Sequence, residues 1–203
     1  MDGGVERVLE AAVEEGFLTP GAAVDGSGHS LGFLAGTPPP TAGQTAVDLG
    51  SGGGLPGVVL ATHTFCHWYL VDRGERRCRF LEWAVRSLDL SDRVSVLQAD
   101  ATELGRGELR GTVSLVTARG FGPPGATVEC GAPLLAEGGH MVVSEPPEGG
   151  PSRWPEGPLG ELGLADAGCW DVEGAGFRAF VAERRCGDRY PRAWRAIVRS
   201  PLF

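Results

Sequence analysis

The sequence lacks several features that would reveal a chemistry directly. It contains no lysine, so all 18 basic residues are arginine, which a coding bias explains without any function. Its five cysteines are odd in number, far apart and never in a C-x-x-C pair. This spacing argues against a zinc site or a disulfide framework. It predicts reduced, buried thiols in a cytoplasmic protein, at Cys66, Cys78, Cys130, Cys169 and Cys186.

Long apolar runs and catalytic constellations are also missing. No apolar run approaches the roughly 18 residues that span a bilayer. The start, Met1–Gly4, has no basic region followed by an apolar one, so no signal peptide is expected. The four histidines are scattered, and no Ser/His/Asp or Cys/His set is visible. We therefore predict no metal site, and we expect a bound cofactor to supply the reactivity if the chain is an enzyme.

The charge balance is acidic, with a basic exception near the end of the sequence. The formal net charge of −8 counts against a general nucleic-acid binder. Residues 178–203, however, hold seven arginines against two acidic residues. These arginines could meet RNA phosphates, with Arg189, Arg192 and Arg195 as candidates. Alternatively, they decorate the solvent side of a hairpin.

The order of apolar patterns predicts alternating strands and helices. A helix over 5–15 is followed by a loop over 19–44 that encloses one short apolar piece at 31–35. The next predicted strands are 45–49, 68–71, 94–98, 113–117 and 140–144. The predicted helices between them are 55–63, 75–88 and 126–135, with a short turn at 102–104. Beyond residue 151 we predict a helix over 158–164 and two antiparallel strands, 178–184 and 194–199.

This alternation predicts that the 203 residues adopt an α/β fold. A mostly parallel, seven-stranded, Rossmann-like sheet would carry helices on both faces and end in an antiparallel hairpin. We expect residues 1–44 to be a short N-terminal helix and loop extension, and residues 45–203 to form the main domain.

The most informative run is VDLGSGGGLPG at residues 47–57. Its glycines lie where a strand must turn into a helix and where a ligand could approach the backbone. The run lacks both the dinucleotide fingerprint and the P-loop Lys-Ser/Thr. With an acid at the end of the next strand, it favours S-adenosylmethionine, whose ribose hydroxyls Asp72 would bind. The alternative is a tight turn, with Asp72 capping the next helix. The candidate cofactor-binding residues here are Asp48, Gly50, Ser51, Gly52, Gly54, Leu55, Asp72 and Arg73.

Two later strand ends add candidates. Asp100 and Ala101 could recognise the adenine ring through the carboxylate and the next backbone N–H, although an N-cap role for Asp100 is the alternative. Arg119 follows the fourth strand, where its side chain should face the cleft. It could bind the cofactor carboxylate or a substrate phosphate, or form a structural salt bridge. Phe121 could stack on a base or pack in the core.

Several of these motifs together resemble one family. The run DLGSGGGLPGVVLA is similar to the cofactor loop of the RsmG (GidB) methyltransferases, and LVDRGERRCRFLEWAV to their second strand and helix. VTARGFGPP and the tail DRYPRAWRAIVRSPLF also resemble family segments. The resemblance implies a class I S-adenosylmethionine-dependent methyltransferase that acts on guanine N7 of small-subunit ribosomal RNA. It also implies that Arg119 frames the acceptor.

The chain departs from the family pattern at both ends. The N-terminal part lacks the His-x-x-Asp-Ser motif, of which His29-Ser30-Leu31 is a faint echo. Glu145 stands where the family has a lysine, and Ile197 and Arg199 replace a proline and a lysine of the tail. A carboxylate near the cleft would favour a small cationic or hydroxylated acceptor. Two alternatives therefore stay open: a small-molecule methyltransferase, and a non-catalytic cofactor-binding module that acts through its arginine-rich tail.

Overall fold

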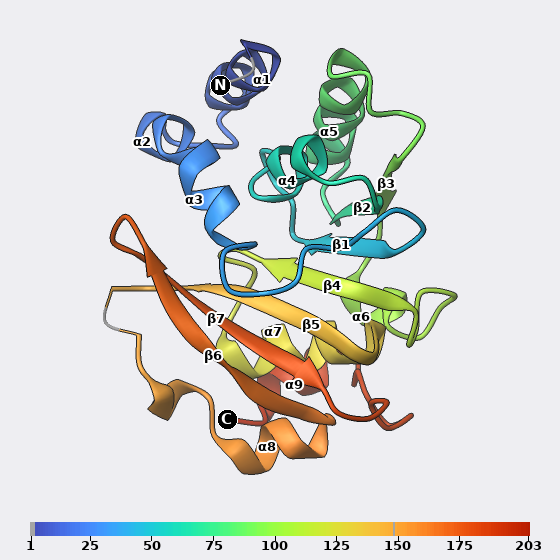
Figure 1. Cartoon of the computed structure of the whole chain (residues 1–203). Coiled ribbons are helices and arrows are strands. Elements are labelled where there is room, and N and C mark those ends of the chain that lie inside the picture. Colours follow the sequence, from blue (N-terminus) through green and yellow to red (C-terminus); the bar gives the residue numbers. More distant parts are fainter. Residues whose placement is uncertain (1–2, 148) are drawn as a thin grey trace.

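The computed structural model describes residues 3–147 and 149–203. Its centre is one seven-stranded sheet with the order β3-β2-β1-β4-β5-β7-β6, which runs from the top to the bottom of Figure 1. The strands are β1 (Thr45–Leu49), β2 (His67–Asp72), β3 (Val94–Gln98), β4 (Val113–Ala118), β5 (Leu135–Glu145), β6 (Leu164–Val172) and β7 (Ala175–Ala182).

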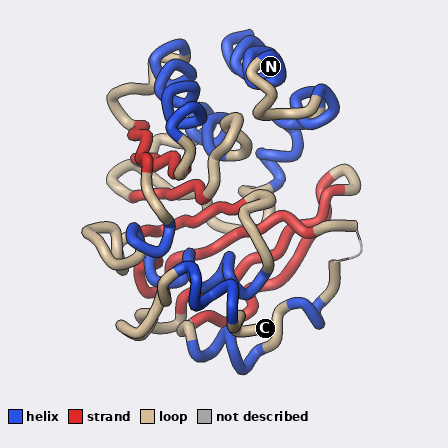
Figure 2. The backbone as a smooth tube through the Cα atoms, turned by 180° about the vertical axis from the view of Figure 1, so that it is seen from behind, coloured by secondary structure: helices blue, strands red, loops and turns tan. Residues whose placement is uncertain are grey.

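Helices precede, connect and follow the strands. Three of them precede the first strand: α1 (Gly3–Glu14), α2 (Pro20–Val24) and α3 (Gly26–Gly32). The others are α4 (Gly57–His63), α5 (Glu75–Ser87), α6 (Ala101–Leu104), α7 (Pro124–Gly131), α8 (Glu156–Glu161) and α9 (Trp194–Arg199), with short 3-10 turns at Ala132–Leu134 and Pro151–Arg153. Seen from behind, helices cover the lower half of the sheet (Figure 2).

The topology confirms the predicted fold class. Strands β1 to β5 pair in parallel, whereas β7 runs antiparallel to both β5 and β6. The strand order reverses between β1 and β4, as in doubly wound sheets that bind ligands at the carboxyl edge. β1 and β3 have the predicted bounds, because each is a short apolar run that is bounded by turn residues.

Side chains of the central strands alternate between two apolar layers. Val47 and Leu49 of β1 belong to a layer that also includes residues of α7, α8 and α9. Ala46 points to the opposite layer, which includes residues of α1, α4 and α5. The alternation continues in β7, where Phe180 lies in the first layer and Phe177 in the second. Because both faces are covered, the strands are almost continuously apolar.

The expected loop over 19–44 is wrong in its first half, which forms α2 and α3. Thr19 caps α2 by accepting a hydrogen bond from the backbone N–H of Ala22 at 3.2 Å. The glycines of α3 resemble loop residues, but they allow close packing. A Cβ at Gly26 would lie 2.8 Å from the Leu55 side chain, and one at Gly32 would lie 2.4 Å from Phe177. Tertiary contact therefore overrides the low helix propensity of glycine.

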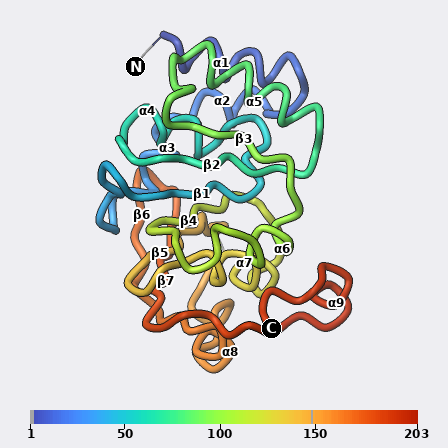
Figure 3. The backbone as a smooth tube through the Cα atoms, turned by 90° about the vertical axis from the view of Figure 1, so that its right-hand side faces the viewer, coloured from blue at the N-terminus to red at the C-terminus, as the bar shows by residue number. Residues whose placement is uncertain are grey.

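The C-terminal prediction is wrong in two places. Residues 194–199 form helix α9 rather than a strand, with Ile197 as the buried anchor. The partner of β7 in the hairpin is β6, which the sequence pattern missed because most of its residues are exposed at the sheet edge. The predicted helix over 158–164 ends earlier, because Leu164 already begins β6. Figure 3 shows α9 on the same side of the sheet as α6 and α7.

All five cysteines are free thiols, and four of them are buried. Cys169 is exposed, so the prediction of burial is wrong there, because β6 is an edge strand. Burial raises the pKa of the Cys130 thiol to about 12 and that of Cys186 to about 11. Within the described residues, no helix has the length and apolar character to cross a membrane.

Candidate functional site

A cavity of about 370 Å³ opens at the carboxyl edge of the sheet. This volume lies in the range of small-molecule sites. Loops after β1, β2, β3 and β4 all contribute to its lining, and two aromatic residues come from more distant parts of the chain. The lining residues are Phe17, Gly50, Gly52, Val71, Asp72, Arg73, Arg77, Ala99, Asp100, Ala101, Gly120, Phe121 and Trp194.

The glycine loop needs glycine for both conformation and space. Gly50, Gly52 and Gly54 have φ angles of +73°, +54° and +99°, in the left-handed region that side chains disfavour. A Cβ at Gly50 would lie 3.0 Å from Phe121, and one at Gly54 would lie 2.9 Å from Val58. The predicted tight turn is therefore present, and the backbone of Gly50 and Gly52 faces the cavity.

Asp48 lies beneath this loop rather than in the cavity wall. It is fully buried, and its carboxylate accepts hydrogen bonds from the Gly57 N–H at 3.1 Å and from the Thr117 hydroxyl at 2.8 Å. Burial raises the pKa of Asp48 to about 6. The carboxylate thus ties the start of α4 to β4, and any effect on a ligand would pass through the loop.

Asp72 lies in the cavity wall and carries most of the polar contacts there. Its Oδ1 accepts hydrogen bonds from the Gly74 N–H at 2.8 Å and from Arg77 Nε at 2.9 Å. Its Oδ2 accepts one from the Gly52 N–H at 3.1 Å. Burial alone would raise the pKa of Asp72, but these hydrogen bonds bring it below its usual value. The carboxylate is therefore ionised at neutral pH and bonded to the glycine loop.

Asp100 has the N-cap role that the sequence left open as the alternative, and it also lines the cavity. Its Oδ1 accepts hydrogen bonds from the N–H of Thr102 at 2.8 Å and from the Thr102 hydroxyl at 2.7 Å, so it is the N-cap of α6. The same residue and Ala101 line the cavity. The cap uses one carboxylate oxygen, and Oδ2 is left for a ligand.

Arg119 follows β4 but is not among the residues that line the cavity, and its charge interacts with His29 of α3. It is half-buried, and burial lowers the pKa of its guanidinium. Its positive charge, together with burial, lowers the pKa of His29. Among the described residues, the Arg119 side chain forms no ion pair, so the salt-bridge alternative is wrong.

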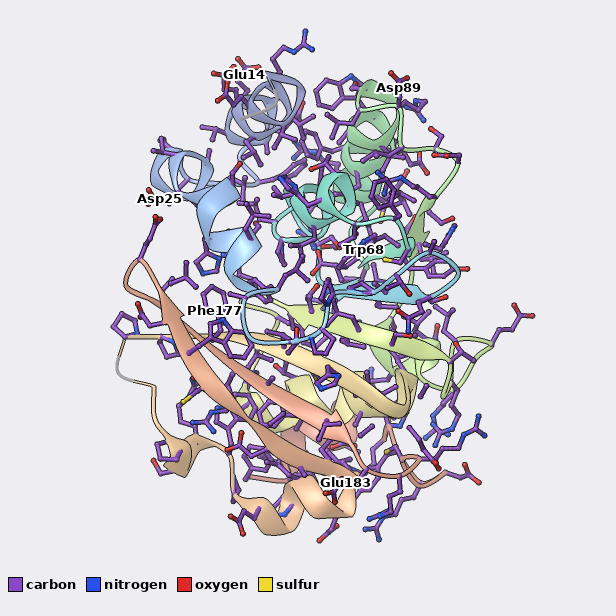
Figure 4. All side chains as sticks on the ribbon, in the orientation of Figure 1. Glu14, Asp25, Trp68, Asp89, Phe177 and Glu183 are labelled. Atoms are coloured by element: carbon purple, nitrogen blue, oxygen red, sulfur yellow. The ribbon has the colours of Figure 1, made fainter. Side chains whose placement is uncertain are left out.

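The histidine that faces this arginine lies where the N-terminal helices meet the C-terminal hairpin. The His29 ring packs 5.1 Å from the ring of Phe177, centroid to centroid, and Figure 4 labels Phe177 just below α3. The Nδ1 atom of His29 is buried and has no hydrogen-bond partner in the described structure. Arg119 and His29 thus offer an unused cation and an unused ring nitrogen on the α3 side.

The remaining loop candidates divide between lining and support. Arg73 lines the cavity. Ser51 is buried and donates a hydrogen bond from its hydroxyl to the Asp48 carbonyl at 3.0 Å. Leu55 is buried against α3. Sequence reasoning missed Phe17, Arg77 and Trp194 as lining residues. Of these three, Arg77 has a signal in the local sequence, because it lies in the first turns of the helix that follows Asp72.

The three candidate tail arginines differ in their surroundings. Arg192 binds Glu129, which is completely buried, through its Nε at 2.7 Å and Nη2 at 2.6 Å. Arg189 pairs with Glu161 at 2.8 Å on the surface, and Arg195 is exposed. Their assignment to substrate RNA stays a prediction, but the Arg192 guanidinium is already engaged within the protein.

Glu145 is also engaged within the protein. Its carboxylate pairs with Arg153 and Arg178 and accepts a hydrogen bond from Trp154 Nε1. Its charge is therefore compensated by arginines on both sides. In the described part of the chain, no group of three histidine, cysteine or acidic residues could hold a metal ion.

Comparison with known proteins places this geometry in one family. The family model described as rRNA small subunit methyltransferase G matches residues 33–145. Ribosomal RNA small subunit methyltransferase G from Kineococcus radiotolerans is 41% identical over 102 residues, which cover 50% of this chain and 39% of the relative. The Salinispora arenicola protein of the same name is 39% identical over 119 residues, which cover 57% of this chain and 49% of the relative. The chain thus spans less than half the length of these relatives.

Solved structures match over a longer stretch but at low identity. The cofactor-bound protein Rv0187 from MTB superposes with a TM-score of 0.68 and 17% identity, covering 91% of this chain and 92% of that one. Geranyl diphosphate C-methyltransferase from Streptomyces coelicolor, solved with geranyl diphosphate and S-adenosyl-L-homocysteine, has a TM-score of 0.60 and 14% identity. That match covers 77% of this chain and 80% of the other. These likenesses show a shared Rossmann-like methyltransferase fold.

Proposed function

Because the chain belongs to the rRNA small subunit methyltransferase G family, we propose that it transfers a methyl group from S-adenosylmethionine to guanine N7 of small-subunit ribosomal RNA. The observation that carries the proposal is the cavity at the carboxyl edge of β1, β2 and β3, where the glycine loop and Asp72 meet. The motifs that lead to this cavity lie within the matched part of the chain, residues 33–145.

The residues of the cavity fit the proposed cofactor. A carboxylate has about four acceptor positions. The two oxygens of Asp72 accept from Gly74, Arg77 and Gly52, so Oδ2 keeps a position for a ribose hydroxyl. Side chains at Gly50 or Gly54 would collide with their surroundings, so the loop backbone stays bare toward the cavity. Asp100 Oδ2 and the Ala101 N–H could meet the edge of the adenine ring.

The reaction requires alignment rather than a general base. The proposed cofactor supplies an electrophilic methyl group on a sulfonium. Guanine N7 carries an in-plane lone pair, which forms the new bond to the methyl carbon while the carbon–sulfur electron pair stays with sulfur, so no proton has to move. Orientation alone can contribute a large part of the rate. The absence of a Ser/His/Asp or Cys/His set in the sequence agrees with this chemistry.

Arg119 is the residue that we propose to frame the acceptor. Its half-buried guanidinium has no ion pair among the described residues and follows β4 next to the cavity residues Gly120 and Phe121. A desolvated arginine without a carboxylate partner favours an anionic ligand. A phosphate of the RNA acceptor or the carboxylate of the cofactor would satisfy it.

The domain boundary and the cellular location of the protein belong to the same proposal. We propose that residues 45–203 form the methyltransferase domain and that residues 1–44 cover its glycine loop. Phe17 lines the cavity, and a Cβ at Gly53 would lie 2.7 Å from Leu18. A ribosomal substrate implies a cytoplasmic protein. The small-molecule alternative loses its main support, because arginines compensate the charge of Glu145.

The test is methyl transfer to ribosomal subunits. Labelled S-adenosylmethionine is incubated with the protein and with small subunits or deproteinised ribosomal RNA from a strain that lacks the gene. We expect label in the RNA, at a guanine that becomes cleavable by borohydride and aniline. Arg119→Ala should abolish incorporation with an unchanged circular dichroism spectrum, whereas the exposed Arg79→Ala should not. Label only in a metabolite extract would refute the RNA acceptor, and unaltered turnover of Arg119→Ala would remove Arg119 from the site.

A further inference from the structure

The C-terminal segment reaches the cavity through one aromatic residue. Trp194 is the first residue of α9, lines the cavity and packs edge-to-face on Phe121, with ring centroids 6.3 Å apart. Phe121 follows β4, whereas Trp194 is far away in the sequence. The segment around Trp194 also lies beyond residues 33–145, which the family model matches. The wall that Trp194 builds is therefore a feature of this chain that the family match does not describe.

The segment that carries Trp194 is fastened on both sides. The Arg192 N–H donates to Glu129 Oε1 at 2.9 Å, and the Arg192 guanidinium holds both oxygens of the same buried carboxylate. Arg110 Nη1 donates to the Tyr190 carbonyl at 2.8 Å. On the other side, Ile197 is completely buried. These contacts fix the backbone two residues before and three residues after the indole.

Contacts of Pro191 place the segment that precedes Trp194 beside α6. A Cβ at Gly105 would lie 3.0 Å from the Pro191 ring, and Arg106 donates a hydrogen bond to the Pro191 carbonyl. The segment thus runs beside the end of α6, whose first residue, Ala101, lines the cavity and belongs to the layer against which Trp194 packs. Trp194 therefore borders the cavity from the loop after β4, and the segment that precedes it packs beside the end of α6.

The indole is free to meet a ligand. Three other tryptophans use their ring N–H within the protein. Trp68 donates to Thr64, Trp154 to Glu145 and Trp170 to the Gly32 carbonyl. In the described structure the Trp194 N–H donates to no protein group, and the residue is only partly buried. A half-exposed aromatic ring that lines a polar cavity is a surface on which a flat heterocycle stacks.

We propose that Trp194, with Phe121, forms an aromatic wall that binds the adenine ring of the cofactor, and that Arg192 and Glu129 are positioning residues that hold this wall in place. The inference rests on the proposed function, because it assumes an adenosine-bearing cofactor. It assigns the C-terminal segment to the cofactor site rather than to RNA. The ligand class is a purine, and Asp100 and Ala101, which line the same cavity, favour adenine over the acceptor guanine.

The experiment measures binding of 5′-methylthioadenosine, which lacks the amino-acid half of the cofactor, beside S-adenosylhomocysteine and guanosine 5′-monophosphate. Calorimetry of Trp194→Ala should show both adenosine ligands weakened by the same factor, about tenfold or more. Trp194→Phe should keep most of the affinity but lose the change in tryptophan emission on binding. The matched control is Trp83→Phe, on α5 and outside the cavity lining, which should keep both.

A second variant tests the positioning residues. Glu129→Gln should weaken 5′-methylthioadenosine, and combining it with Trp194→Ala should cause no further loss, because both act through the same ring. Additive losses would overturn the positioning role.

Three outcomes would overturn the aromatic wall. Trp194→Ala could bind 5′-methylthioadenosine within twofold of the unmodified protein, the loss could appear only with S-adenosylhomocysteine, or only guanosine 5′-monophosphate could be affected. If the unmodified protein binds neither adenosine ligand, the proposed function itself fails together with this inference.

Discussion

The cavity has two walls of different origin. One wall consists of the loops after β1, β2 and β3. Each strand is followed at once by two residues that line the cavity or ends in one of them: Gly50 and Gly52, Asp72 and Arg73, Asp100 and Ala101. The other wall is formed by Trp194, near the end of the sequence, with Phe121. The first wall is held by hydrogen bonds of the Asp72 carboxylate to the Gly52 and Gly74 amides. The second is held by a buried ion pair between α7 and the C-terminal segment.

This difference between the two walls indicates where the ligand specificity of the cavity can change without loss of the fold. The loop wall is continuous with the sheet, so altering it affects the turn from strand to helix. The aromatic wall is attached by side chains, chiefly Arg192 to Glu129. It can therefore be loosened while the sheet persists. The experiments below separate the two walls.

The largest effect is expected from Asp72→Ala in the loop wall. The change removes an acceptor for the ribose and leaves Arg77 without its partner. A hydrogen bond to a charged group contributes about 1.5–3 kcal/mol, so binding of S-adenosylhomocysteine should fall by about ten- to hundredfold in calorimetry. Asp92→Ala, an exposed acid on the same half of the sheet, is the control. Unchanged affinity in Asp72→Ala would disprove the cofactor assignment.

Glu129→Ala tests the anchor of the aromatic wall. Glu129 is completely buried, and its removal leaves the Arg192 guanidinium without its carboxylate. Breaking a buried pair in this way costs about 3 kcal/mol, so the free energy of unfolding in urea should fall by about that amount. Glu15→Ala removes the partner of Arg76 in an exposed pair and should cost at most about 1 kcal/mol. Equal losses in both variants would show that Glu129 is no special anchor.

The smallest effect is a pH dependence beneath the loop wall. Burial raises the folded-state pKa of Asp48 to about 6, above the value of about 3.9 in an unfolded chain. The folded protein therefore binds this proton more tightly. The stability of the unmodified protein relative to Asp48→Asn should fall as pH rises from about 4 to about 6 and stay constant above. Urea unfolding at several pH values measures this difference.

Asp72 provides the opposite sign in the same experiment. Its folded-state pKa is lowered, so its contribution to stability is present above the unfolded value and is lost as the pH falls. Relative to Asp72→Asn, the unmodified protein should lose stability on acidification. The same sign at both positions would contradict the contrast between a desolvated and a hydrogen-bonded carboxylate.

The predictable part of this protein coincides with its local signals. The strands β1 and β3, the glycine turn and the cavity residue Asp72 could be predicted because each carries a local sequence signal. Helix α3 could not, because its glycines are explained by contacts with Leu55 and Phe177. Helix α9 was mistaken for a strand, because six residues with one buried position have no distinctive period.

The roles of charged residues show the same limit. Glu145, Arg192 and Arg119 are all visible as charges in the sequence, but only the structure shows which are compensated. Glu145 meets two arginines and Arg192 meets Glu129, whereas Arg119 has no ion-pair partner within residues 3–147 and 149–203. The predicted RNA contact of Arg192 stays untested, but its guanidinium pairs with the buried Glu129 carboxylate, which no local pattern reveals.

The sequence by itself determined the parallel sheet, its carboxyl edge and the loop that turns there, because alternating apolar runs and glycine spacing act over a few residues. Only the tertiary structure decided which side chains complete the cavity and which charges remain unpaired. Phe17 and Trp194 are separated by most of the chain, and they line one cavity because the two apolar layers of the sheet hold both chain ends beside it. Such contacts depend on packing in three dimensions, which no spacing along the chain encodes.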